Sequence, residues 1–226
     1  MQGALRTLGR STVFVHPPLQ HSQEQLRALY VKISSTCEYE NFIRQPDGAR
    51  LEKVDGERGS VTRVTFGRDR ITFYEEDPSG SLEWFSRRVE GVLIATREVI
   101  PALQVFIARV GTQRSALPLQ EGNDSSSWLS EKALNIGEEE LSVFARPAQA
   151  IGLRLQLPAA NKKEQHQLRI ESYLKDRRML YLEDISTWGG IVPISNVAPL
   201  LDEMREADRF HREDLLEFLR ALDAKF

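Results

Sequence analysis

The spacing of apolar residues changes several times along the chain, and each spacing predicts a different element. Around residues 23–37 apolar positions recur every three or four residues, which is the repeat of an amphipathic helix. Ser22 and Gln25 form a capping-box pattern at its start. A second helical stripe covers residues 82–100, and Pro101 ends it because the residue before a proline avoids helical backbone angles. We therefore expect two helices in the first part of the chain.

Other stretches alternate apolar and polar residues, which indicates strands with one buried face. Residues 61–76 alternate around a turn and predict a hairpin. Residues 151–157 alternate most regularly, whereas residues 103–110 are nearly all apolar, as in a central strand covered on both faces. Residues 1–11 are polar, so we expect them to be loose and the first strand to be confined to Val13–Val15.

A long helix is predicted to close the chain, from about Ser195 to Leu222. Its apolar positions follow alternating steps of four and three, a heptad pattern with two polar residues at its centre. The seam residues are Val197, Leu201, Met204, Asp208, His211, Leu215, Phe218 and Leu222. Such a helix is about 40 Å long, which is more than one sheet face usually covers. We therefore expect a homodimer formed through the C-terminal helix.

A charged string of ten residues occurs twice, about half the chain apart. RDRITFYEED (Arg68–Asp77) and KDRRMLYLED (Lys175–Asp184) share five identical positions. With the alternating strands, this repeat predicts an α+β protein of two similar halves, each an antiparallel sheet packed with helices, plus the long C-terminal helix. The first half is placed at residues 1–119, a linker and short helix at 120–137, and the second half with the long helix at 138–226.

The repeated string has a chemical and a structural interpretation. Its carboxylates could act as a pair in acid–base chemistry. Alternatively, Asp and Arg pair within the turn, the tyrosine packs its ring on the sheet, and Glu-Asp ends the strand. We favour the structural interpretation, because a duplicated structural device appears twice whereas an active site usually does not.

Charge and cysteine content narrow the setting of the protein. The 226 residues carry a net charge of −3, so no overall field attracts nucleic acid or an anionic membrane. No apolar run reaches the roughly 18 residues of a membrane-spanning helix. Cys37 is the one cysteine, which rules out an internal disulfide and fits a reducing compartment. We expect a cytoplasmic protein with neither a nucleic-acid nor a membrane partner.

Several common chemistries leave motifs that this sequence lacks. It contains no phosphate-binding P-loop, no dinucleotide fingerprint, no Gly-x-Ser-x-Gly elbow and no His-Glu-x-x-His. One cysteine and four scattered histidines make a zinc site of Cys and His ligands implausible. We therefore expect no cofactor and no metal, assign no catalytic residue, and lean against an enzyme.

One candidate for ligand binding lies at the end of the apolar strand. Arg109 and Arg114 flank Gly111, a residue that would let a backbone or an anion approach closely. The planar guanidinium group suits carboxylate or phosphate. The alternative is that Arg109 pairs with a carboxylate of the protein itself and Arg114 is solvated.

Asp208 and His211 form a second candidate, on the predicted C-terminal helix. Residues three apart on a helix are neighbours, so the carboxylate could orient the histidine as a general base. The alternative is a buried polar pair that fixes the register of the helix, or two groups at a solvated bend. No nucleophile can be placed beside them from the sequence, and we favour the structural alternative.

The chain resembles an uncharacterised, sporadically distributed bacterial family of roughly this length. Its members open with an Asn-Pro-Pro-hydrophobic motif, carry a mid-chain strand ending in Arg-hydrophobic-Gly-x-Arg-Tyr, and finish with a long helix rich in Leu, His and Phe. Here His16–Leu19 stands at the first motif, with His for Asn. Arg109–Arg114 is similar to the second, with one extra residue and Ser115 for Tyr, and Leu200–Leu219 to the third. The family has no assigned function, so the resemblance implies no activity.

Three classes of function remain open. The first is a non-catalytic binding or assembly protein that acts through the C-terminal helix and an exposed sheet face on a protein partner; a chaperone-like role is one form of it. The second is a binder of a small anionic ligand near Arg109 and Arg114. The third is a hydrolase-type enzyme that uses Asp208 and His211. We favour the first.

Overall fold

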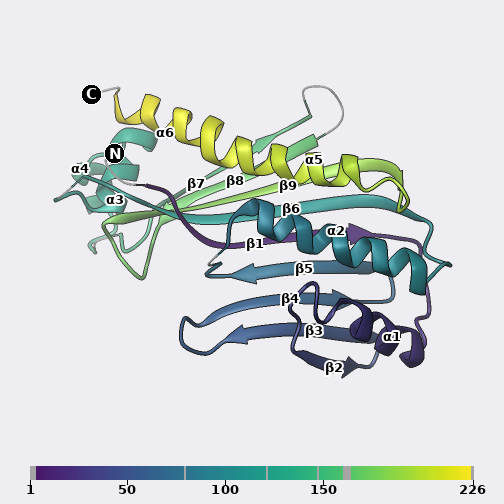
Figure 1. Ribbon diagram of the computed structural model, residues 1–226. Helices are drawn as coiled ribbons and strands as arrows, with labels where there is room; N and C mark the ends of the chain where they lie inside the picture. The colour runs from purple at the N-terminus through teal and green to yellow at the C-terminus, as the bar shows by residue number, and fades with distance from the viewer. Residues whose placement is uncertain (1–3, 79, 121, 147, 160–163, 225–226) are drawn as a thin grey trace.

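Nine antiparallel strands form one continuous sheet in the computed structural model of the chain (Figure 1). The structure describes residues 4–224 apart from 79, 121, 147 and 160–163. The strand order is β2-β3-β4-β5-β1-β6-β9-β8-β7. The strands are β1 (Arg6–Val15), β2 (Asn41–Gln45), β3 (Gly48–Asp55), β4 (Ser60–Phe66), β5 (Arg70–Glu76), β6 (Val105–Pro118), β7 (Gly152–Leu157), β8 (Glu164–Ser172) and β9 (Met179–Pro193).

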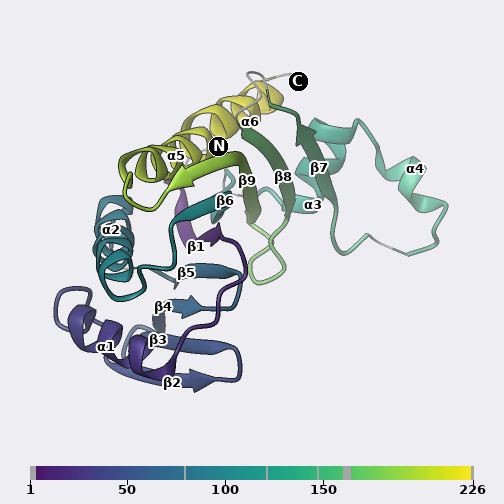
Figure 2. The ribbon, with the colours of Figure 1, turned by 90° about the vertical axis from the view of Figure 1, so that its right-hand side faces the viewer.

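The long helices gather on one side of this sheet. The helical segments are α1 (Gln23–Ile33), α2 (Leu82–Val99), α3 (Ser125–Trp128), η1 (Leu129–Leu134), α4 (Glu138–Ser142), α5 (Ala198–Arg209), η2 (Phe210–Asp214) and α6 (Leu215–Asp223), of which η1 and η2 have π-helical hydrogen bonding. Figure 2 shows α1, α2, α5 and α6 on the same side, with α3 and α4 near β7. We call the side covered by the long helices the helix face and the other side the open face.

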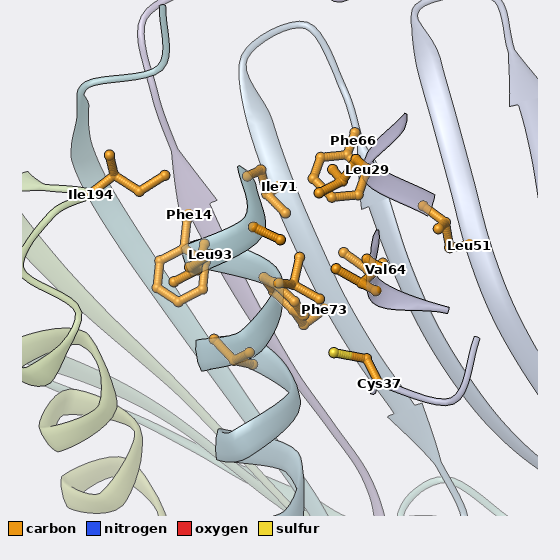
Figure 3. Packing of buried hydrophobic residues seen from close by; sticks show 14 of the residues in the cluster. Phe14, Leu29, Cys37, Leu51, Val64, Phe66, Ile71, Phe73, Leu93 and Ile194 are labelled. Atoms are coloured by element: carbon orange, nitrogen blue, oxygen red, sulfur yellow. The ribbon is translucent and has the colours of Figure 1, made fainter. Parts of the chain in front are cut away.

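The apolar core lies between the helix face and the helices, in two clusters. The larger cluster lies beneath α1, α2 and α5. Phe14 of β1 is at its centre, with the rings of Phe73 and Phe106 5.8 and 5.1 Å away, and Leu93 of α2 packs over them (Figure 3). The smaller cluster lies beneath α6, around Leu182 of β9. Burial of these side chains fixes which face of each strand meets the helices.

Buried polar side chains lie between the two apolar clusters. At one end of this region Arg10 Nε lies 3.3 Å from Glu75 Oε2, and Arg88 Nη1 donates to Glu75 Oε1 at 3.0 Å. All three side chains are at least nine-tenths buried. Burial raises the pKa of Glu75, although both arginines act to lower it. A second polar group lies beneath the C-terminal helix and is described with the candidate site.

The expected division into two similar halves, each with an antiparallel sheet, is wrong. β1 pairs with β5 on one side and with β6 on the other, so backbone hydrogen bonds run through the sheet without a boundary. The cause is the N-terminal stretch expected to be loose, because Arg6–Val15 forms a full central strand. The two copies of the repeated string lie in one sheet, in β5 and β9, on either side of the β1–β6 pair. The fold is a mixed α+β fold.

Predictions that depend on residues close together in the chain were confirmed more often than the arrangement of the sheet. The Ser22–Gln25 capping box is formed at α1, and residues 61–76 form the β4–β5 hairpin. Residues 120–137 were expected to hold a linker and a short helix. The helical segments α3 and η1 occupy most of this stretch, and residue 121 lies outside the described residues.

The long C-terminal helix is present, as α5, η2 and α6. Its heptad seam faces its own sheet: Leu201, Met204, Leu215 and Leu222 are buried in the two apolar clusters. The seam is therefore already used within the chain, and a homodimer through this helix stays a prediction. None of the described helices is long and apolar enough to cross a membrane.

Candidate functional site

The predicted anion-binding residues do not come together. Arg109 is on the helix face and is 4% exposed, and its Nε donates to Glu203 Oε2 of α5 at 2.9 Å. Its Nη1 donates to the backbone oxygen of Gly190. Gly111 is on the same face, where an added Cβ would lie 3.3 Å from the ring of Trp188. Arg109 is therefore engaged by a carboxylate of the chain, and Gly111 makes room for a tryptophan.

Arg114 lies on the opposite side of the sheet from Arg109. The two are five residues apart on β6, and neighbouring residues of a strand point to opposite faces. Arg114 is therefore on the open face, where it is half-buried. Arg114 is therefore accessible from the open face, unlike Arg109.

A row of alternating arginine and tyrosine side chains crosses the open face. We call Arg63, Tyr74, Arg114, Tyr181 and Arg169 the Tyr–Arg row; the strand register places all five on this face. The guanidinium carbons of Arg63 and Arg114 lie 5.7 and 5.4 Å from the ring centroid of Tyr74. That of Arg169 lies 5.5 Å from the centroid of Tyr181. These are cation–π distances, so the row consists of two groups of contacts, one around Tyr74 and one around Tyr181.

A glutamate two residues along the same strand holds each tyrosine of the row. The hydroxyl of Tyr74 donates to Glu76 Oε2 at 3.0 Å, and that of Tyr181 donates to Glu183 Oε2 at 2.8 Å. Burial raises the pKa of Tyr181, and the contact with Glu183 adds to the effect, so this phenol stays protonated at neutral pH. The repeated string thus provides the same Tyr-x-Glu contact on β5 and on β9, and its tyrosines lie on the sheet surface.

Gly9 allows Arg114 to reach across a whole strand. Arg114 is on β6 and Tyr74 is on β5, with β1 between them. Gly9 of β1 is the register partner of Arg114. A Cβ at position 9 would lie 2.6 Å from Arg114 Nη2 and 2.9 Å from the backbone oxygen of Glu75. A side chain here would displace the guanidinium group of Arg114, so the contact between Arg114 and Tyr74 requires glycine at position 9.

Charge compensation differs along the row. Arg63 Nε lies 3.3 Å from Glu52 Oε2, and Arg169 Nη1 lies 3.9 Å from Glu183 Oε1. Within the described part of the chain Arg114 forms no ion pair. Partial burial lowers its pKa, but a hydrogen bond with Tyr74 and nearby negative charge outweigh this, so the pKa is raised and Arg114 is always charged. The centre of the row is therefore a cation without a paired carboxylate.

Asp208 and His211, the second predicted pair, each interact with a different side chain. Asp208 accepts from Arg212 Nε at 2.9 Å on the surface of the helix. His211 points into the sheet, and its Nε2 lies 2.7 Å from Ser115 Oγ of β6. His211 lies in the π-helical segment η2, where the widened turn interrupts the regular helical spacing. The histidine thus has a hydroxyl partner that the sequence could not place.

A second buried histidine lies in the same polar region. His166 Nδ1 of β8 lies 3.0 Å from Asp184 Oδ1, and Ser186 Oγ donates to Asp184 Oδ2 at 2.7 Å. The ring of His166 stacks on Phe210 of η2, with centroids 3.7 Å apart. This group was missed at the sequence level because His166 stands alone in the chain, 18 residues from its carboxylate partner.

Serine, histidine and aspartate recur here, but the geometry does not support hydrolysis. A serine and histidine at 2.7 Å match a nucleophile and its base. However, Ser115 is 1% and His211 3% exposed, so a substrate cannot reach the hydroxyl. Burial lowers the pKa of His211 to about 4, against the opposing fields of Asp184 and Asp208. A histidine this acidic is a poor base near neutral pH. The pair therefore fits a structural role beneath the helix.

The comparisons with known proteins place no constraint on the function. No protein-family model matches the chain, and no curated protein matches it. The resemblance to a bacterial family stays a prediction. Among the described residues, no group of three or more His, Cys, Asp or Glu side chains is placed to hold a metal ion.

Proposed function

We propose that this is a non-catalytic binding or assembly protein whose contact surface is the open face of its sheet. The observation that carries the proposal is the Tyr–Arg row, which runs over β4, β5, β6, β9 and β8 on the side away from the helices. A chaperone-like role is one form of this function.

The composition and rigidity of the row support a binding role. Tyrosine and arginine are enriched among the residues that dominate binding energy at protein interfaces. Here they stand on a hydrogen-bonded sheet, and the Glu76 and Glu183 contacts hold the tyrosines in place. These tyrosines would therefore lose little side-chain entropy when a partner binds, which favours affinity.

Two other features fit the proposal. The polar residues of the helix face that resemble catalytic groups are buried, whereas the row is accessible. The single cysteine, Cys37, is a buried free thiol, and we propose a cytoplasmic location on that ground.

Affinity capture with matched variants tests the proposal. The bait is the full chain, the double variant Tyr74→Ala/Tyr181→Ala, or the control Val31→Ala/Ile94→Ala, whose residues are exposed on the helices. We expect at least one protein to be retained by the wild type and the control and lost with the tyrosine variant. Equal retention by all three baits would contradict the proposal, and so would retention of nothing. Circular dichroism confirms that each bait is folded.

A further inference from the structure

Arg114 is the one arginine of the Tyr–Arg row that forms no ion pair within the described part of the chain. Arg63 is compensated by Glu52, and Arg169 by Glu171 and, at a longer distance, by Glu183. Glu183 is also the register partner of Arg114, but it accepts the hydroxyl of Tyr181. Glu76, across β1, accepts the hydroxyl of Tyr74. Both nearby glutamates therefore accept hydrogen bonds from tyrosines, and Glu183 acts on Arg114 only through its field, without an ion pair.

The position of Arg114 has features of a recognition group. Its guanidinium lies across Gly9 and against the ring of Tyr74, at 5.4 Å from the ring centroid. An arginine held against an aromatic ring loses little freedom when its planar donor fork makes two parallel hydrogen bonds to a carboxylate. Because it is half-buried, solvent screens such a contact less than it would at a fully exposed site.

The length of the row indicates what kind of molecule carries that carboxylate. From β4 to β8 the row spans five strand spacings, or about 24 Å at about 4.8 Å each. An extended peptide of about seven residues covers the same distance at about 3.3 Å per residue. A small acid would contact only the centre of the row.

A hollow beside the row adds room for a side chain of such a segment. It has a volume of about 420 Å³ and is lined on the open face by Gln167, Arg169 and Ile185. It therefore adjoins the β8 end of the row, where a residue of a bound segment beyond its acidic centre would lie.

We propose that the open face binds an extended protein segment with a central Asp or Glu, whose carboxylate pairs with Arg114 while flanking residues lie on Tyr74 and Tyr181. The inference rests on the proposed function and adds the chemistry of the partner. It differs from the anion site expected from the sequence, since Arg109 takes no part and the ligand is a polypeptide.

Selection from a display library of random linear 12-residue peptides tests the inference on the full chain. Each selected peptide is resynthesised, and its Kd is measured for the wild type, Arg114→Gln, Arg114→Lys, Tyr74→Ala and Arg87→Gln. Arg87 is an exposed arginine of α2 and serves as the matched control. We expect a recurrent Asp or Glu in the peptides and an affinity loss of about 10-fold or more with Arg114→Gln. The loss should be smaller with Arg114→Lys, and Arg87→Gln should leave the affinity unchanged.

The other outcomes separate the inference from the function on which it rests. Peptides that require Tyr74 but neither an acidic residue nor Arg114 would overturn the inference and leave the proposed function standing. Failure to select any peptide, or selection only of peptides insensitive to Tyr74→Ala, would overturn both. If glutarate alone binds as tightly as the peptides and needs Arg114, the ligand is a small acid, and the polypeptide part is wrong.

Discussion

Burial of His211 predicts a specific loss of stability on acidification. The pKa of this histidine falls from an ordinary 6.5 to about 4 in the folded protein, because the side chain is desolvated beneath the C-terminal helix. Between these two values the unfolded chain binds a proton that the folded protein does not. Stability is therefore fully present above about pH 6.5 and is lost as the pH falls towards about 4.

The size of the effect follows from the two pKa values. A difference of about 2.5 units corresponds to about 3 kcal/mol in total, at about 1.4 kcal/mol per unit. Between about pH 7 and pH 5 the same relation gives a loss of about 2 kcal/mol. The neighbouring charges are Asp184, Asp208 and Arg212. His16 and His21 also have pKa values lowered by burial, so they add to the slope of the whole protein.

Urea unfolding of the wild type and of His211→Gln, at about pH 7, 6 and 5, isolates this contribution. Glutamine does not titrate, so the variant should lose about 2 kcal/mol less than the wild type over this range. The contributions of His16 and His21 cancel in the difference. Parallel pH profiles for the two proteins would refute the reasoning, whatever the stability of the variant at neutral pH.

Three further predictions concern the packing. Arg88→Met leaves Glu75 buried with one cation fewer, so the free energy of unfolding in urea should fall by about 3–5 kcal/mol. The control Arg87→Met, at the exposed neighbour, should change this free energy by no more than about 0.5 kcal/mol. Equal effects of the two substitutions would contradict the role of the buried pair. Burial raises the pKa of the Cys37 thiol, so it should react with Ellman's reagent only after unfolding, and rapid reaction in the native protein would contradict this. Ser22→Ala removes half of the capping box and should lower stability by about 1 kcal/mol, and a thermal melt without a shift would argue against the cap.

The sequence revealed the elements whose cause is local. A capping box, a proline stop and a hairpin depend on residues close together in the chain, and those at Ser22, Pro101 and residues 61–76 were identified correctly. The pairing of strands depends on contacts between distant residues, so the single sheet could not be foreseen in the same way. Only the end of β1, Val13–Val15, was predicted, because the buried face of the strand carries Arg10 and Thr12 before it reaches Phe14. A pattern based on apolar residues fails where the core is polar.

The candidate residues show the same division. The separation of Arg109 from Arg114 could have been predicted from the sequence, since an odd spacing on a strand places two residues on opposite faces. The contact of His211 with Ser115 could not be predicted from the sequence, because the two residues are 96 positions apart in the chain. The repeated string contains the two tyrosines of the Tyr–Arg row, but it did not predict the row itself. Its tyrosines lie on the sheet surface as expected, but the arginines that stack on them come from other strands.

Site-specific photo-crosslinking in living cells tests the central claim most directly. A benzophenone amino acid replaces Tyr74 or Tyr181 on the open face, or Val31 or Ile94 on the exposed surface of the helices. The account predicts crosslinked adducts from positions 74 and 181, the same partner at both, and none of that partner from positions 31 and 94. Adducts formed only from the helix positions would show that the protein uses its other side, and the binding role of the open face would be wrong.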